Sequence, residues 1–291
     1  MIRIGTRGSA LALAQAQWVA ERLDATTELV TITTLGDRGA AQEDKSRWVS
    51  ALEHALLEGT IDLAVHSAKD VPAELAGGLE PLAIPSRADA RDVICGAPSL
   101  AALNSGARVG TSSLRRAAQL RAARDDVEVV PLRGNVDTRL RKLGDGEVHA
   151  LVLAAAGLER LGRGDEAGGV LGELVPAAGQ GALLIEGRPG ALDPERVKTI
   201  ADPETTACVT AERDVVRALG ASCNTPVGAH ARRINSDELE LRAWVGLPDG
   251  SRWISDRVEG AAAGLGIALA ERLRSVGAGE LLAKAEREVH A

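Results

Sequence analysis

The first 181 residues alternate short apolar strands with helical segments, and this alternation limits the possible folds more than any other feature. The patterning predicts strands at 2–6, 28–35, 61–66, 79–84, 93–96, 108–110, 127–132 and 150–154. It predicts helices at 10–25, 47–58, 114–123, 136–143 and 156–161. Strands that alternate with helices form parallel-rich sheets covered by helices on both faces, so we expect an α/β fold.

Residues 200–291 follow a different pattern, in which a long helix at 204–219 is followed by a meander. In one strand every second residue is apolar and faces the same way: Leu239, Leu241, Ala243, Val245 and Leu247. A Pro-Asp-Gly turn at 248–250 comes next, and then two helices at 261–275 and 279–289. This pattern predicts a small α+β domain with a one-sided antiparallel sheet.

The composition argues against nucleic acid as a partner. The 291 residues have a net charge of −7 and include four Trp but no Phe or Tyr. The core must therefore consist of Ala, Leu, Val and Ile, and few aromatic rings remain on which bases could stack. The acidic balance also disfavours binding to a phosphate backbone.

Neither a membrane segment nor a secretion signal is predicted. No stretch approaches the roughly 20 apolar residues of a membrane helix, and the N-terminus has the pattern of a strand followed by an amphipathic helix. The three cysteines include no C-x-x-C pair, which disfavours a disulfide framework and a zinc site. We expect a cytoplasmic protein without a metal.

Arginines gather where predicted strands end and helices begin. They are Arg3, Arg7 (close to Ser9), Arg115, Arg116, Arg133 and Arg139. A helix N-terminus offers unpaired N–H groups and a partial positive charge, and a capping hydroxyl with a guanidinium completes an anion site. Any one of these arginines could be an ordinary surface residue. Their matched positions favour a single ligand with several carboxylates or phosphates.

Asp70 follows a buried strand in V-H-S-A-K-D-V-P and has two interpretations. Aspartate is common in turns and caps. Alternatively its carboxylate lies at the mouth of a cleft, stays ionised among the arginines and pairs with cationic nitrogens of a substrate. His66 in the same segment is expected to be structural, and Lys69 fits either role.

The three cysteines have different surroundings. Cys95 lies in an apolar strand and Cys208 in a helix, so both are expected to be inert core residues. Cys223 lies in a loop of Gly, Ser, Asn and Pro, where its thiol should be exposed. A reactive role for Cys223 stays open, but no neighbouring base supports a protease-like Cys/His pair.

Eight motifs follow one another in the order typical of the hydroxymethylbilane synthases, also called porphobilinogen deaminases, and the chain resembles that family almost from end to end. The motifs are I-R-I-G-T-R-G-S, A-V-H-S-A-K-D-V-P, V-G-T-S-S-L-R-R, L-R-G-N-V-D-T-R-L, L-A-A-A-G-L-E-R-L-G, P-A-A-G-Q-G-A, T-A-E-R and C-N-T-P-V-G. The resemblance implies two type II periplasmic-binding-protein-like α/β domains with mixed, parallel-rich sheets. It also implies a small α+β C-terminal domain with a three-stranded antiparallel sheet. We expect these domains at 1–85 plus 182–199, at 86–181 and at 200–291.

The resemblance also implies a reaction and a covalent cofactor. The family polymerises four porphobilinogen molecules on a dipyrromethane primer held by a cysteine thioether, releases ammonia, and frees hydroxymethylbilane by hydrolysis in tetrapyrrole biosynthesis. Cys223 matches the cofactor cysteine and Asp70 the catalytic aspartate. Positions matching cofactor contacts are Ser113, Arg115, Arg116, Arg133 and Lys69. Positions matching substrate contacts are Arg3, Arg7, Ser9, Arg139, Arg160 and Gln180.

One region departs from the family pattern. Between the second strand and the second helix the family usually has G-G-K-G-x-F with another lysine upstream, whereas this chain has A-Q-E-D-K-S-R-W. Lys45 and Trp48 could replace the lysine and the phenylalanine. The polar loop at 36–47 is expected to be a mobile lid, although the missing glycines leave that role open.

Two other classes of protein remain as alternatives. A non-catalytic two-domain protein that binds a polyanionic solute would also have arginines in its cleft. Such a protein would carry a secretion signal, and it would give Cys223 no role. A nucleic-acid-binding regulator would need a basic surface. We expect a monomeric enzyme with a small-molecule substrate and neither a nucleic-acid nor a membrane partner.

Overall fold

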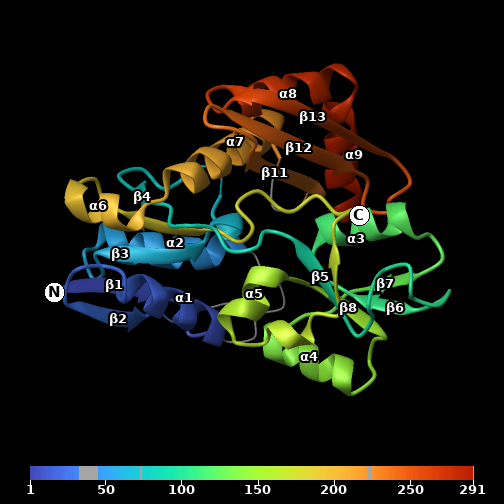
Figure 1. Ribbon diagram of the computed structural model, residues 1–291, viewed down its shortest axis with the longest axis horizontal. Helices are drawn as coiled ribbons and strands as arrows, with labels where there is room; N and C mark the ends of the chain where they lie inside the picture. Colours follow the sequence, from blue (N-terminus) through green and yellow to red (C-terminus); the bar gives the residue numbers. More distant parts are fainter. Residues whose placement is uncertain (33–44, 73, 222–224, 291) are drawn as a thin grey trace. The chain divides into compact units, whose positions relative to one another are not determined.

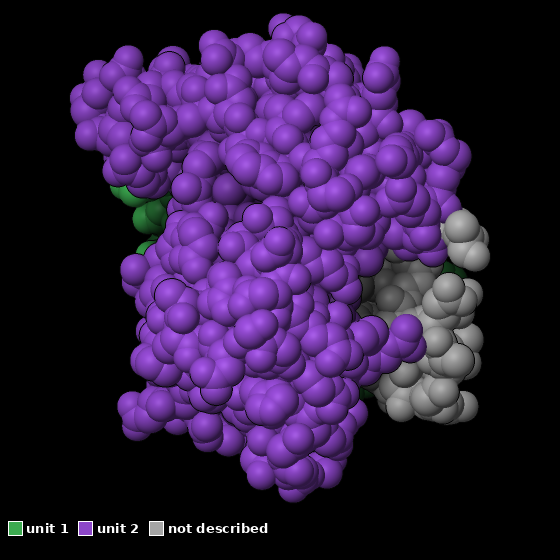
Figure 2. All heavy atoms as spheres, turned by 90° about the vertical axis from the view of Figure 1, so that its right-hand side faces the viewer, with its two compact units in different colours: residues 1–88, 181–207 green, residues 89–180, 208–291 purple. Residues whose placement is uncertain are grey.

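The computed structural model describes residues 1–32, 45–72, 74–221 and 225–290 (Figure 1). The chain divides into two compact units, coloured separately in Figure 2. Unit 1 comprises residues 1–88 and 181–207, and unit 2 comprises residues 89–180 and 208–291. The C-terminal segment groups with residues 89–180 in this division, so a separate third domain stays a prediction.

Unit 1 is built on a five-stranded sheet with the order β2-β1-β3-β10-β4 (Figure 1). Its strands are β1 (Ile2–Thr6), β2 (Thr27–Thr31), β3 (Leu63–Ser67), β4 (Glu80–Ala83) and β10 (Leu183–Gly187). β1 runs parallel to β2 and β3, whereas β10 is antiparallel to β3 and β4. Because β1 and β3 are parallel neighbours, their carboxyl ends lie at the same edge of the sheet.

Helices cover both faces of this sheet. On one face, Ala16 and Val19 of α1 (Ala10–Ala20) share a core with Ile4, Leu63 and residues around α6 (Pro194–Ile200). On the other face, α2 (Lys45–Leu57) contributes Leu52 to a second core. This arrangement confirms the α/β fold expected from the alternating pattern.

The larger sheet of unit 2 repeats the same arrangement in the order β7-β6-β8-β5-β9. Its strands are β5 (Asp92–Cys95), β6 (Arg108–Gly110), β7 (Glu128–Val130), β8 (Ala150–Ala154) and β9 (Gly169–Leu171). β6 is parallel to β7 and β8, and β5 is antiparallel to β8 and β9. In each five-stranded sheet one strand, β10 or β5, thus runs antiparallel to both of its neighbours, which gives the mixed, parallel-rich sheets that the type II resemblance implied.

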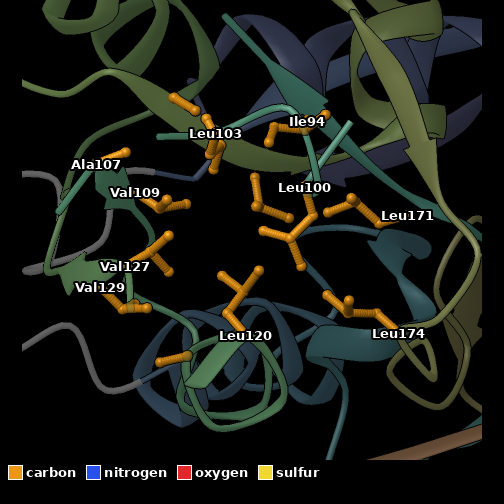
Figure 3. Packing of buried hydrophobic residues seen from close by; sticks show 13 residues of the cluster. Ile94, Leu100, Leu103, Ala107, Val109, Leu120, Val127, Val129, Leu171 and Leu174 are labelled. Carbon is orange, nitrogen blue, oxygen red and sulfur yellow. The ribbon is translucent and has the colours of Figure 1, made fainter. Parts of the chain in front are cut away.

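Aliphatic side chains, together with Cys95, form the two core clusters of this sheet. The cluster on one face joins Leu120 of α3 (Leu114–Ala123) to Val109 and Val129 of the strands (Figure 3). The opposite cluster receives Leu140 from α4 (Val136–Gly144) and Leu158 from α5 (Ala155–Arg160). A core without Phe or Tyr was predicted from the composition.

The third sheet is antiparallel and has the order β11-β12-β13. Its strands are β11 (Val227–Arg233), β12 (Glu238–Gly246) and β13 (Trp253–Ala261), and three helices accompany it: α7 (Pro203–Leu219), α8 (Leu265–Ser275) and α9 (Ala278–His290). The predicted apolar face of β12 is buried, with Leu241 and Ala243 fully inaccessible. The helix expected from residue 261 begins only at Leu265, because β13 continues to Ala261 and Gly264, at φ 75°, precedes the first turn.

Candidate active site

Unit 1 contains a pocket of about 90 Å³ at the carboxyl edge of β1 and β3. Three predicted site residues line it: Arg7, Ser9 and Asp70. Arg7 directly follows β1, and Ser9 caps α1 by accepting the N–H of Ala12 at 3.2 Å. Asp70 ends the short 3-10 helix η2 (Ala68–Asp70) that follows β3. The sequence brings the three together because their strands are parallel neighbours.

Three polar residues of this pocket were not predicted as site residues: Gln15, His66 and Ser67. The Gln15 amide donates to Ser67 Oγ at 2.9 Å. Gln15 is one of the buried residues of α1. A polar side chain on an otherwise apolar helix face is the sequence feature that could have marked it as a site residue. The structural role expected for His66 is confirmed, because its Nε2 lies 2.8 Å from a carboxylate oxygen of the fully buried Glu186.

Arg3 lies at the opposite edge of the sheet from Arg7, which corrects the expectation that both follow the carboxyl end of a strand. It is the second residue of β1. Its guanidinium donates to both oxygens of Asp62, at 3.1 and 2.7 Å, and these bonds lower the pKa of that carboxyl. Asp62 directly precedes β3, at the edge where the parallel strands begin.

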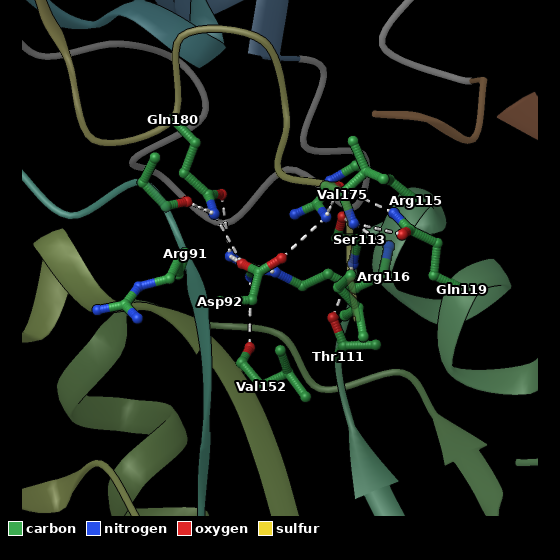
Figure 4. A network of polar contacts seen from close by, with 12 residues as sticks. Arg91, Asp92, Thr111, Ser113, Arg115, Arg116, Gln119, Val152, Val175 and Gln180 are labelled. Carbon is green, nitrogen blue, oxygen red and sulfur yellow. Dashed lines mark hydrogen bonds and ion pairs between the residues drawn. The ribbon is translucent and has the colours of Figure 1, made fainter. Parts of the chain in front are cut away.

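In unit 2, Arg115 and Arg116 converge on a carboxylate that the sequence did not single out (Figure 4). Both arginines lie in the first turn of α3, and Ser113 caps that helix by accepting the N–H of Arg116 at 3.4 Å. Asp92 lies 2.8 Å from Arg115 and 2.7 Å from Arg116. All three side chains are buried, and Asp92 is fully inaccessible.

Gln180 completes this network, although it is distant in sequence. Its amide donates to Asp92 at 2.8 Å and to the carbonyl of Ala90 at 2.7 Å, while its oxygen accepts from Arg116 at 3.3 Å (Figure 4). Arg115 also donates to the carbonyl of Val175 at 2.7 Å. The predicted residues Ser113, Arg115, Arg116 and Gln180 therefore lie in one connected group of unit 2.

The charges of the network depend on one another. Burial alone would raise the pKa of Asp92, but the guanidinium groups of Arg115 and Arg116 outweigh it and hold this pKa well below its usual range. Burial lowers the pKa of Arg115, and Asp92 only partly offsets this effect. Two guanidinium groups facing one carboxylate leave the buried cluster with an excess positive charge.

The remaining predicted arginines of unit 2 lie after β7 or in the helices α4 and α5. Arg133 follows β7 and is exposed, whereas Arg139 lies in α4 and donates to the carbonyl of Gly134 at 2.7 Å. Arg160 ends α5, and burial lowers its pKa. Because β6, β7 and β8 are parallel, the turns that follow them share one edge of the sheet.

Several other predicted residues do not line the pocket or lie outside the described residues. Lys69 lies in η2 beside Asp70 but not among the pocket-lining residues. Cys223 and most of the predicted lid at 36–47 lie outside the described residues, as do the side chains of Lys45 and Trp48. Cys95 and Cys208 are buried as expected, and burial raises the pKa of Cys95 to about 11.

Comparisons with known proteins assign the chain to a family. One family model, described as porphobilinogen deaminase, dipyromethane cofactor binding domain, matches residues 2–195, and the model of the porphobilinogen deaminase C-terminal domain matches 206–275. The chain belongs to the porphobilinogen deaminase family. Porphobilinogen deaminase is hydroxymethylbilane synthase, so this family member is a transferase of porphyrin biosynthesis with a dipyrromethane cofactor.

The regions matched by similar proteins cover most of the chain. The porphobilinogen deaminase of Thermus thermophilus is 46% identical over 297 residues, which is 98% of this chain and 99% of that protein. That of Deinococcus deserti is 48% identical over 273 residues, or 87% and 88% of the two chains. A solved ABC-transporter periplasmic substrate-binding protein from Coxiella burnetii is 15% identical, with a TM-score of 0.43 over 73% of this chain and 97% of that one.

The buried network of unit 2 suits a cofactor that carries carboxylates. Arg115 Nε is buried and has no hydrogen-bond partner among the residues that the structure describes. An unused guanidinium N–H in a cluster with excess positive charge matches a carboxylate in both charge and geometry.

Within the described ranges, no helix has the length and apolar character needed to span a membrane.

Proposed function

We propose that this chain joins four porphobilinogen molecules head to tail, with loss of ammonia at each step, and frees hydroxymethylbilane by hydrolysis. The pocket of unit 1 is the observation that carries this proposal, because it combines Asp70 with Arg7 and the capped N-terminus of α1. Each porphobilinogen brings a pyrrole N–H and two carboxylates. An acid beside a guanidinium within one small concavity provides a partner for both kinds of group.

Asp70 is the proposed catalytic residue. Its carboxylate accepts the pyrrole N–H and stabilises the positive charge that develops on the substrate as ammonia leaves. Each coupling breaks the C–N bond of the aminomethyl group and forms a C–C bond to a free pyrrole α-carbon. The proton lost from that α-carbon balances the ammonium ion that is released.

Cationic, hydroxyl and amide side chains are proposed to hold the substrate and the cofactor. For the substrate and the growing product we propose Arg7, Ser9, Arg139, Arg160 and Gln180. For the cofactor we propose Ser113, Arg115, Arg116, Arg133 and Lys69. Arg3 is left out of this set because it is bound to Asp62 at the other edge of its sheet.

We further propose that Cys223 carries the cofactor through a thioether. When bound, the dipyrromethane supplies the α-carbon on which the product grows. A cytoplasmic monomer that binds no nucleic acid completes the proposal, and the net charge of −7 supports the last point.

Ammonia release distinguishes this enzyme from a binding protein with the same kind of fold. Purified protein supplied with excess porphobilinogen should release four molecules of ammonia for each linear tetrapyrrole. Both quantities can be followed in one reaction, by a coupled ammonia assay and by the absorbance of the cyclised and oxidised product. A protein that only binds the substrate would return it unchanged, and that result would refute the proposal.

A further inference from the structure

Glu212, in the T-A-E-R motif, is a buried carboxylate to which the proposed reaction gives no role. It lies in α7 and is fully inaccessible. Its oxygens accept two backbone N–H groups, from Gly179 at 2.6 Å and from Ala231 at 2.7 Å. Burying a carboxylate is unfavourable unless such bonds compensate for the lost water. The two bonds therefore tie the backbone at Gly179 and the backbone at Ala231 to α7.

The bond to Gly179 holds a short turn in place. Gly179 has φ 73°, a backbone conformation that favours glycine, and the next residue is Gln180. Ala231 belongs to β11, so the same carboxylate also fixes this strand of the antiparallel sheet. His230 Nδ1 lies 3.3 Å from Glu212, so a partly exposed imidazole lies beside the carboxylate.

Gln180 transmits this restraint to the arginine cluster. Its side chain donates to Asp92 and accepts from Arg116. The backbone of its turn is held by Glu212 through the neighbouring Gly179. A continuous series of contacts, all within unit 2, thus runs from α7 to the first turn of α3.

We infer that Glu212 is a positioning residue, which holds Gln180 so that Arg115 and Arg116 are set to receive the carboxylates of the cofactor. The inference rests on the proposed cofactor-binding role of those arginines. α7 ends at Leu219, four residues before Cys223. One helix therefore restrains the arginine cluster and leads into the segment with the cofactor cysteine.

Glu212→Gln tests this role, because the amide has a single accepting oxygen and its NH₂ would face a backbone N–H. We expect the fraction of folded chains that carry the cofactor to fall when porphobilinogen is limiting. We expect KM for porphobilinogen to rise about tenfold, the order expected for one lost hydrogen bond to a charged group, with a smaller change in kcat. The readouts are intact mass after gel filtration and steady-state kinetics.

Glu204→Gln is the matched control, since Glu204 lies on the same helix but is exposed. This variant should keep both cofactor loading and KM. If Glu212→Gln does not fold, Glu212→Asp takes its place, because it keeps the charge and shortens the reach by one methylene. Loading and KM equal to those of the unmodified chain in the folded variant would overturn the inference.

A double-mutant cycle with Gln180→Ala separates positioning from general support of the fold. If Glu212 acts through Gln180, the double variant should have the KM of Gln180→Ala alone. Independent, multiplied effects on KM would contradict the inference. The proposed function is tested by ammonia release from the unmodified chain, whereas this cycle compares the KM of the variants with that of the unmodified chain. Failure of the inference about Glu212 can therefore be distinguished from failure of the proposed function.

Discussion

Asp70→Asn is expected to lower kcat by about 10²- to 10⁴-fold while the protein stays folded. Asparagine keeps the shape of the side chain but lacks the negative charge, so positive charge on the substrate is no longer stabilised as ammonia leaves. Arg7 and Ser9, the residues proposed to bind the substrate carboxylates, line the same pocket and are unchanged in this variant. We therefore expect KM to change much less than kcat. Steady-state kinetics and a thermal unfolding curve measure the two effects.

Asp62→Asn is the matched control for this variant. Asp62 precedes the same strand that Asp70 follows, but it lies at the opposite edge of the sheet and is bound to Arg3. Its loss should leave kcat within about threefold of the unmodified chain, because Asp62 is not among the residues that line the pocket containing Asp70. Near-normal turnover in Asp70→Asn, or an equal loss in Asp62→Asn, would remove Asp70 from its catalytic role.

Asp92→Asn should lower the free energy of unfolding by about 3–5 kcal/mol, the usual cost of breaking a buried ion pair from one side. Asp92 is fully inaccessible, and Arg115 and Arg116 would stay buried without their counter-charge. Urea denaturation measures the effect. Asp126→Asn is the control, since Asp126 is exposed and pairs with the half-buried Arg124, so its loss should change the midpoint little.

The same variant has a predicted pH dependence. The folded state lowers the pKa of Asp92, so its contribution to stability is present above the unfolded pKa of about 3.9 and is lost as pH falls toward the folded value. The stability difference between the unmodified chain and Asp92→Asn should be constant from about pH 5 to 8 and should shrink below about pH 4. A difference that grows on acidification would contradict the ion-pair account.

The pocket of unit 1 could be predicted because it depends on local order along the chain. Strand–helix alternation sets which residues follow the carboxyl end of each parallel strand, and Arg7, Ser9 and Asp70 all do. Arg3 was placed incorrectly by the same reasoning. It precedes Arg7 by only four residues, but these residues span the length of β1 and separate the two edges of the sheet.

The buried carboxylates could not be predicted because their partners are distant in sequence. Asp92 meets Arg116 across 24 residues, and Glu186 meets His66 across 120 residues. An acidic residue at the start of a strand cannot be distinguished by sequence from an ordinary surface residue. Only the order of the strands in the sheet shows that it is buried. Glu212 is similar, since nothing in the helical pattern of α7 indicates that two backbone N–H groups converge on it.

Intact mass under denaturing conditions tests the central claim most directly, namely that Cys223 holds a primer of two linked pyrrole units. The unmodified chain should exceed its sequence mass by two such units, and Cys223→Ser should lose this excess. Cys208→Ser should keep it, because Cys208 is buried in the core. A fully active chain at its plain sequence mass, or an excess that persists in Cys223→Ser, would contradict the account.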